Sequence, residues 1–94
     1  MRIVYIAGPI TGIDDYRERF ARAEAQVRER KGVEAVLNPA VLPGGLPQEA
    51  YMPICLDMLQ QADTICLMPG WRASPGANME RRFAEYQGKD IVEL

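Results

Sequence analysis

Hydrophobic residues in this chain form two kinds of pattern that alternate along its length. Short, nearly continuous apolar runs are typical of strands that are buried on both faces of a parallel sheet. These runs cover residues 3–7, 33–37, 63–68 and 90–94. Between them, apolar residues recur every three or four positions, which predicts amphipathic helices. The helical stretches cover residues 16–27, 48–62 and 75–87.

Strands and helices that alternate in this way predict one α/β domain over residues 1–94, with a four-stranded parallel sheet and helices on both faces. No internal repeat, linker or low-complexity segment divides the chain. A domain of this size buries only roughly 60–65% of the surface of its unfolded chain. We therefore expect the small sheet to complete its core by forming a homodimer.

Composition and charge narrow the classes of function. Hydrophobic residues make up 48% and charged residues 26% of the chain, and the net charge is −2, so a large basic surface for a nucleic acid polymer is not expected. No apolar run reaches the roughly 18–20 residues of a membrane span, and we expect no signal peptide. The chain has no histidine, which excludes histidine-based catalysis.

The two cysteines, Cys55 and Cys66, are eleven positions apart and fit neither a CxxC motif nor a zinc spacing. Each lies in an apolar stretch, so we expect two reduced thiols in the core of a cytoplasmic protein. The sequence leads us to expect no metal and no cofactor.

Three loops should meet at one edge of the predicted sheet, because ligands of parallel α/β sheets bind beyond the carboxyl ends of the strands. These loops cover residues 8–12, 38–39 and 69–76. The candidate ligand-binding residues of the first two are Gly8, Pro9, Thr11 and Asn38. Each turn taken alone is also compatible with an ordinary strand-to-helix connection. The first loop has neither a GxGxxG pattern nor a Walker lysine, which disfavours a dinucleotide site or a P-loop.

The last helix begins with residues that favour an anion site. Ser74 is typical of an N-cap, and Pro75 is typical of the first helical position. Backbone N–H groups at Ser74, Gly76 and Ala77 would then point beyond the helix start, where anions bind.

Glu80 lies one turn inside the same helix, between Ala77 and Ala84 on one face. This small-residue stripe should lie against the sheet and direct the carboxylate toward the strand ends. Solvent exposure is the alternative for a glutamate on any helix.

Three stretches resemble the nucleoside 2-deoxyribosyltransferase superfamily in sequence and in order. They are Tyr5-Ile6-Ala7-Gly8-Pro9, Leu59-Gln60-Gln61-Ala62-Asp63 and residues 69–84, where Ser-x-Gly-x-x-x-Glu is the most specific pattern. The superfamily includes the 2′-deoxynucleoside 5′-phosphate N-hydrolases, and the resemblance is closest to small phage-type members. It implies a small flavodoxin-like three-layer sandwich.

The resemblance also implies roles for single residues. Glu80 matches the nucleophile that attacks C1′ of the deoxyribose, and Tyr5 matches the tyrosine that orients this carboxylate. Gly8 matches a loop glycine whose backbone meets the ligand. Ser74 and Gly76 match positions that bind the 5′ end of the nucleoside.

One position departs from the family pattern. The family carries an aspartate on the second helix, eight residues before Asp63, where this chain has Cys55. A neutral thiol cannot replace that aspartate as a general acid. Asp57 is the nearest carboxylate along the chain and a second candidate, although it should point to another side of the helix, where a surface role is its alternative.

Trp71 and Arg72 follow the third strand, next to the expected pocket. Trp71 could stack on a base and Arg72 could meet a phosphate. Alternatively, Trp71 packs against a neighbouring subunit.

These observations predict an N-glycosidase that cleaves or transfers the N-glycosidic bond of a (deoxy)nucleoside or its 5′-monophosphate. Ser74 favours the monophosphate, because the transferases carry a carboxylate there that would repel it. A catalytically silent nucleotide-binding module is the alternative, and Cys55 favours it. A dimeric interaction protein with a vestigial pocket is a third reading.

Overall fold

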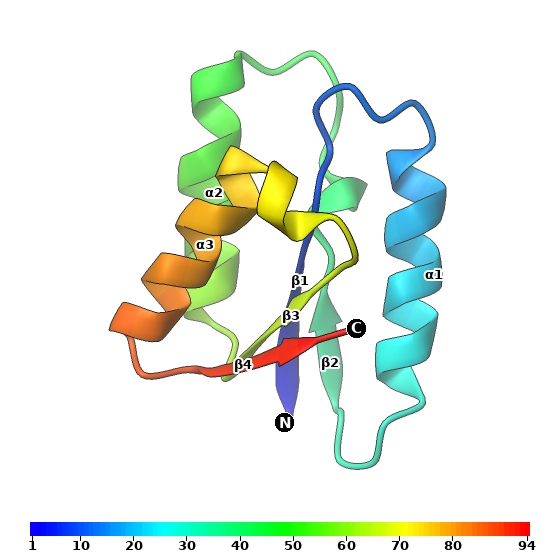
Figure 1. Cartoon of the computed structure of the whole chain (residues 1–94), viewed down its shortest axis with the longest axis vertical. Helices are drawn as coiled ribbons and strands as arrows, with labels where there is room; N and C mark the ends of the chain where they lie inside the picture. The colour runs from blue at the N-terminus through cyan, green and yellow to red at the C-terminus, as the bar shows by residue number, and fades with distance from the viewer.

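Strands β1 (Ile3–Ala7) and β3 (Thr64–Leu67) lie side by side at the centre of a four-stranded sheet, with β2 (Ala35–Leu37) and β4 (Asp90–Glu93) at its edges (Figure 1). All pairs are parallel, and the order is β2-β1-β3-β4. This computed structural model describes all residues, 1–94. The remaining elements are α1 (Tyr16–Arg28), the 3₁₀ turn η1 (Pro39–Val41), α2 (Gln48–Gln60), the 3₁₀ turn η2 (Trp71–Ala73) and α3 (Pro75–Tyr86).

The helices cover the two faces of the sheet unequally. On one face, Val4 and Ile6 pack in the clusters that contain Phe20 and Val27 of α1. On the other face, Tyr5 and its neighbours on β3 pack against α2 and α3. The successive residues of β1 therefore point to opposite helix layers, as the period of a strand requires. The predicted fold class is confirmed: the chain forms a small flavodoxin-like sandwich of three layers.

The strand order reverses between β1 and β3. From β1 the chain passes through α1 to β2 on one side, and α2 then carries it back across to β3 on the other side. The loops after β1 and β3 leave in opposite directions, which opens a space between them at the carboxyl edge. This edge is where the sequence predicts the ligand site.

Three strands are shorter than predicted: β2 and β3 by two residues each and β4 by one. Residues 33–37 were expected as a strand, but β2 begins at Ala35. The N–H of Val33 donates to the carbonyl of Arg30 and so belongs to the turn after α1. Val33 still packs against the core next to Val27, which explains its apolar character without a place in the ladder.

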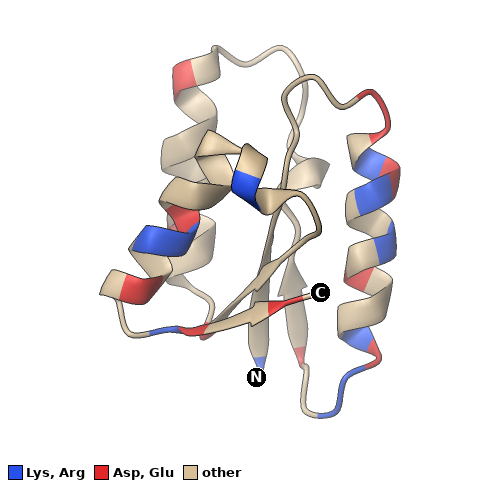
Figure 2. Cartoon of the chain, in the orientation of Figure 1, with Lys and Arg blue, Asp and Glu red and all other residues tan.

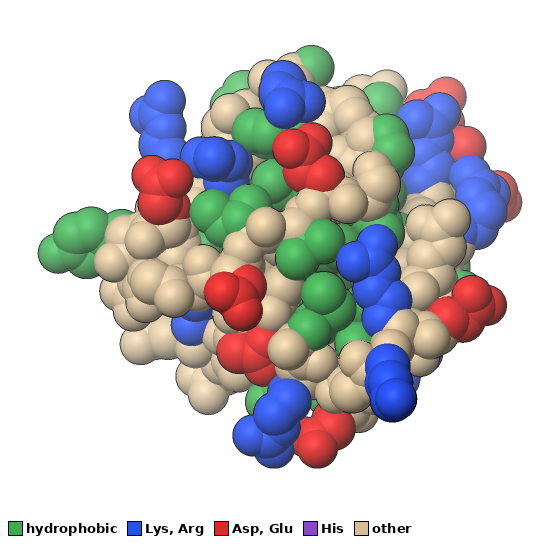
Figure 3. Space-filling view, turned by 60° about the horizontal axis from the view of Figure 1, so that its bottom comes forward, with side chains coloured by type: hydrophobic (Ala, Val, Ile, Leu, Met, Phe, Trp, Pro, Cys, Tyr) green, Lys and Arg blue, Asp and Glu red, His purple; other side chains and the backbone are tan.

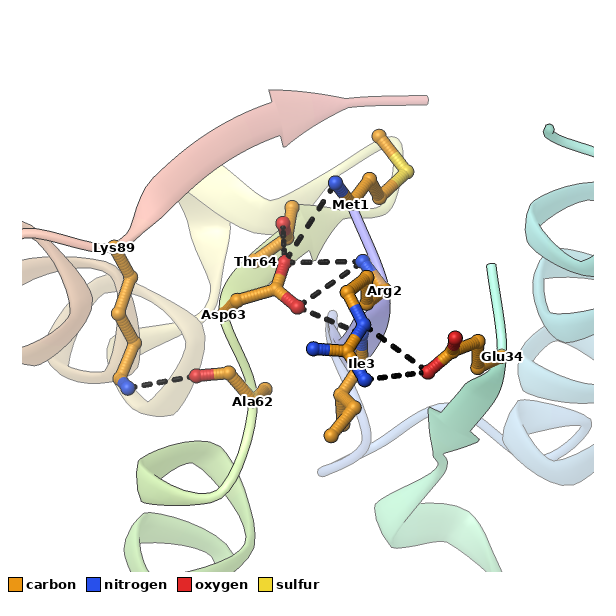
Figure 4. Close-up of polar contacts among 8 residues, drawn as sticks. All are labelled: Met1, Arg2, Ile3, Glu34, Ala62, Asp63, Thr64 and Lys89. Carbon is orange, nitrogen blue, oxygen red and sulfur yellow. Dashed lines mark hydrogen bonds and ion pairs between the residues drawn. The ribbon is translucent and has the colours of Figure 1, made fainter. Parts of the chain in front are cut away.

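Asp63 fastens the opposite, amino-terminal edge of the sheet (Figure 4). Its carboxylate accepts hydrogen bonds from the backbone N–H groups of Arg2 (3.0 Å) and Ile3 (2.8 Å) and from the hydroxyl of Thr64. These bonds lower the pKa of Asp63, against the opposing effect of its partial burial. Asp63 is thus a structural residue far along the sheet from the predicted site.

We expect Asp63→Ala to lower the free energy of unfolding by about 1–2 kcal/mol, because two backbone donors at the start of β1 lose a charged acceptor. Urea unfolding at pH 7 measures the change. Asp14→Ala is the matched control, since Asp14 is an exposed carboxylate with no hydrogen bond in the chain. Equal effects for both variants would contradict the structural role of Asp63.

The sheet face behind β3 and β4 has no helix of its own, because α1 packs on β1 and β2. Val92 and Leu94 therefore remain only partly buried there. Figure 3 shows hydrophobic side chains gathered between charged ones on the side that includes the amino-terminal edge of the sheet. The homodimer stays a prediction, and the sheet face that carries Val92 and Leu94 is available as its interface.

None of the helices has the length and apolar character needed to cross a membrane.

Candidate functional site

A buried tyrosine–glutamate pair lies at the centre of the predicted site. The phenol O–H of Tyr5 donates to Oε2 of Glu80 at 2.6 Å. Tyr5 is fully buried and Glu80 is 6% exposed. Tyr5 comes from the middle of β1 and Glu80 from the second turn of α3, so residues 75 positions apart meet only in the folded chain.

Burial controls the ionisation of this pair. It raises the pKa of Glu80 to about 7, although the hydrogen bond from Tyr5 opposes the shift. The pKa of Tyr5 is raised far above its ordinary value, first by burial and then by the charge of Glu80. The phenol therefore remains a proton donor to Glu80, and Glu80 is the group that changes charge near neutral pH.

The start of α3 holds Glu80 in place. Ser74 caps the helix, and its Oγ accepts a hydrogen bond from the N–H of Ala77 at 3.2 Å. The amide of Asn78 donates to the carbonyls of Trp71 and Ser74, which ties the helix start to the preceding turn. Ala77 and Ala84 are buried on the face that carries Glu80. The prediction of a small-residue stripe that lies against the sheet is confirmed.

A cavity of about 650 Å³ opens at the carboxyl edge of the sheet and contains Glu80 in its wall. Its volume lies within the roughly 300–1,000 Å³ typical of small-molecule pockets. The lining comes from the loop after β1, the loop before α2, the first turns of α2 and the start of α3. The residues are Gly8, Pro9, Ile10, Thr11, Tyr16, Pro39, Leu42, Gln48, Tyr51, Met52, Cys55, Ala73, Ser74, Pro75, Gly76, Ala77 and Glu80.

Cys55 lines the same cavity from α2 and is 8% exposed. Burial raises the pKa of its thiol, the charge of Glu80 adds to the shift, and the Tyr5 hydroxyl opposes it. Both cysteines are free and buried, as predicted. The cavity wall therefore contains a neutral thiol at the position where the resemblance noted in the sequence led us to look for an aspartate.

Six of the ten predicted site residues line the cavity, and Tyr5 lies directly behind Glu80. The six are Gly8, Pro9, Thr11, Ser74, Gly76 and Glu80. The other three, Asn38, Asp57 and Trp71, lie outside the cavity wall.

Asn38 stabilises the backbone and does not line the cavity. Its Oδ1 accepts from the N–H of Ala40 and caps η1, while its amide donates to Glu24 of α1. Both ends of the side chain are therefore engaged.

Asp57 is exposed on α2 and contributes nothing to the cavity wall. Its position two residues after Cys55 turns it away, as helix geometry requires.

Trp71 packs in the core and neither lines the cavity nor stands exposed at its rim. Its indole N–H donates to Glu93 of β4 at 3.0 Å. The guanidinium of Arg72 lies over the ring at 4.6 Å and that of Arg81 at 5.6 Å. Trp71 thus connects η2 with β4 and α3, and it does not stand where it could stack on a base in the cavity. Its packing against a neighbouring subunit stays the alternative prediction.

The helix start offers fewer free donors than predicted. Pro75 has no N–H, the N–H of Ala77 is occupied by Ser74, and the N–H of Ser74 itself donates to the carbonyl of Trp71. The N–H of Gly76 is the one that makes no hydrogen bond within the chain. Because these N–H groups are engaged within the chain, they are not available to the anion that the sequence predicts at this helix start.

Tyr16, Gln48, Tyr51 and Met52 line the cavity but were not predicted as site residues. Tyr16 and Tyr51 belong to apolar helical stripes, which indicate core positions. Both lie in the first turns of their helices, beyond the cover of the sheet. The hydroxyl of Tyr51 also donates to the carbonyl of Pro43 at 2.7 Å and holds the loop before α2. The tyrosine hydroxyl, a polar group on an otherwise apolar helical stripe, was the feature of the sequence that could have indicated these two site residues.

Gly8 is required by a close approach of two strand ends. A Cβ atom at this position would lie 2.8 Å from Sδ and 2.9 Å from Cβ of Met68. We expect Gly8→Ala to lower the free energy of unfolding by roughly 1–3 kcal/mol, because the backbone must shift to relieve this overlap. Gly76→Ala is the matched control, since its Cβ would meet Met52 at an ordinary 3.6 Å. Thermal unfolding compares the two, and equal stability would contradict the close approach.

The chain contains no group of three or more His, Cys, Asp or Glu side chains arranged to hold a metal ion.

No curated protein and no solved structure matches the chain. A model of the family described as a domain of unknown function, DUF4406, matches residues 2–93. Because this match covers nearly the whole sequence, the chain belongs to the DUF4406 family.

Proposed function

We propose that this protein is a nucleoside 2-deoxyribosyltransferase-like N-glycosidase that cleaves or transfers the N-glycosidic bond of a (deoxy)nucleoside or its 5′-monophosphate. The observation that carries the proposal is the buried Tyr5–Glu80 hydrogen bond of 2.6 Å at the wall of the cavity. A carboxylate held in this way is suited to stabilise, and then bond to, an electron-poor sugar carbon.

The two oxygens of Glu80 support different tasks. Oε2 accepts the hydrogen bond from Tyr5, and Oε1 has no hydrogen-bond partner in the chain. Since every fully buried side-chain polar atom has a partner, Oε1 is open to the cavity. In the proposed reaction Oε1 attacks C1′, the C1′–N bond breaks, and its electron pair leaves with the base, which takes a proton from water.

The covalent intermediate is an ester between Glu80 and C1′. Water hydrolyses it to the free sugar, or a second base takes the sugar and completes a transfer. In either case the Glu80 carboxylate is regenerated with its hydrogen bond to Tyr5. Neither step requires a metal or a cofactor, and the reduced thiols of Cys55 and Cys66 are compatible with a cytoplasmic location.

A catalytically silent binding module is the second candidate. Cys55 favours it, because Glu80 is the only carboxylate in the cavity wall and no second carboxylic acid there could protonate the leaving base. Such a module would bind a nucleoside or nucleotide without releasing the base.

Chromatography of free bases tests the proposal. The purified protein is incubated at pH 8, where Glu80 is mostly ionised, with the four deoxynucleosides and their 5′-monophosphates. Base release that requires the protein supports the N-glycosidase, and dependence on an added acceptor base distinguishes transfer from hydrolysis. Binding without release for every compound supports the silent module and contradicts the enzyme.

A further inference from the structure

The cavity contains no positively charged side chain. Among its lining residues, Glu80 alone can carry a formal charge near neutral pH, because the remaining ionisable groups are tyrosine hydroxyls and the Cys55 thiol. Figure 2 shows no charged residue along the whole loop between β2 and α2. A phosphate monoester carries roughly −1.5 to −2 charges at pH 7. Inside this cavity such a group would meet a carboxylate and no counter-charge.

The backbone at the start of α3 cannot replace the missing cation. Phosphates at helix starts are held by several N–H groups together. Here Pro75 has none, Ala77 donates to Ser74 Oγ at 3.2 Å, and Asn78 donates to the Ser74 carbonyl at 3.0 Å. What remains is the N–H of Gly76 and the hydrogen of the Ser74 hydroxyl, whose oxygen already accepts from Ala77. Two donors match one hydroxyl oxygen of a ligand and not three phosphate oxygens.

The arginines near the site are engaged elsewhere. Arg17 donates to the carbonyl of Leu42 at 3.4 Å, lies over the ring of Tyr16, and lines a separate groove between α1 and η1. Arg72 lies over Trp71 and forms an ion pair with Glu93 at 3.6 Å.

We infer that the cavity selects an uncharged nucleoside over its 5′-monophosphate, with one sugar hydroxyl bound between the Gly76 N–H and the Ser74 hydroxyl. This inference rests on the proposed function and narrows its substrate class. It also reverses the preference for a monophosphate that Ser74 indicates in the sequence. A serine permits a phosphate only when several free amides or a cation accompany it, and capping leaves only the Gly76 amide free at this helix start.

Calorimetric titration tests the selection directly. Wild-type protein is titrated at pH 8 with each deoxynucleoside and with its 5′-monophosphate, and chromatography afterwards corrects for any turnover. We expect at least one nucleoside to bind about tenfold or more tightly than its monophosphate. Equal or tighter binding of the monophosphates, or no binding of any nucleoside, overturns the inference. If a monophosphate preference disappears in Arg17→Gln, Arg17 is the missing cation.

A matched pair of variants tests where the 5′ end lies. Ala73 is exposed, lines the cavity and precedes Ser74. Ala73→Lys should raise the affinity for the monophosphate relative to that for the nucleoside about tenfold, because it supplies the absent cation. Ala73→Met has a similar length without the charge and should leave the ratio between the two ligands unchanged. Equal ratios in both variants would remove the sugar's 5′ end from the α3 start.

Release and binding together separate this inference from the proposed function. Selective nucleoside binding without base release overturns the enzyme and retains the selection. Glu80-dependent release that is as fast from monophosphates as from nucleosides retains the enzyme and overturns the selection.

Discussion

Glu80→Gln is expected to lower the rate of base release at least about a thousand-fold at pH 8. The amide keeps the size of the side chain and can still accept the hydrogen bond from Tyr5, which is 2.6 Å long in the native pair. It cannot, however, form the bond to C1′ or stabilise positive charge on the sugar. Free-base chromatography with a saturating nucleoside measures the loss.

Two further variants make this result specific. Asp57→Asn removes an exposed carboxylate outside the cavity and should leave the rate unchanged. Tyr5→Phe removes the hydrogen bond to Glu80 and keeps the ring in the core, so we expect an intermediate loss. Circular dichroism confirms that each variant is folded. Turnover by Glu80→Gln at the wild-type rate would rule out Glu80 as the nucleophile.

The free energy of unfolding should fall by roughly 2–3 kcal/mol between pH 5 and pH 8. Burial raises the pKa of Glu80 from its ordinary value of 4.5 to about 7 in the folded protein. Between these values the folded state retains a proton that the unfolded chain has released. The folded state therefore binds more protons than the unfolded chain, and its stability decreases as the pH rises.

The chain is well suited to this measurement because it has no histidine, the side chain that ordinarily titrates in this window. Urea unfolding at four pH values from 5 to 8 gives the slope. In Glu80→Gln the slope should nearly disappear, and the variant should be more stable than the wild type at pH 8. An unchanged slope in Glu80→Gln would mean that Glu80 is not the group responsible.

Much of the fold was accessible from the sequence because it depends on local patterns. The continuous apolar run of β1 and the stripe of Phe20, Ala23 and Val27 on α1 identify their elements without reference to the rest of the chain. Ser74 and Pro75 mark the start of α3 for the same reason, since a cap is formed by neighbouring residues. β2 was predicted two residues too long because Val33 is apolar for packing and not for strand pairing.

The candidate site likewise contains residues that the sequence predicts and residues whose positions depend on distant partners. Glu80 and Tyr5 were predicted in part from a small-residue stripe and in part from a family resemblance, and the structure brings them into contact. Asn38 and Trp71 were misplaced because their partners, Glu24 and Glu93, are distant along the chain. No local pattern indicates that an amide or an indole is already satisfied by a residue from another element.

The sequence alone determined the succession of strands and helices along the chain, the absence of histidine and the cap that begins α3. These follow from periodicity, composition and the hydrogen-bonding habits of adjacent residues. Only the tertiary structure decided which residues of each loop line the cavity. It also decided that the backbone N–H of Gly76 remains free at the α3 start and that the cavity wall contains no positively charged side chain. Those features depend on contacts between residues that lie far apart in the chain, and such contacts exist only once the sheet has assembled.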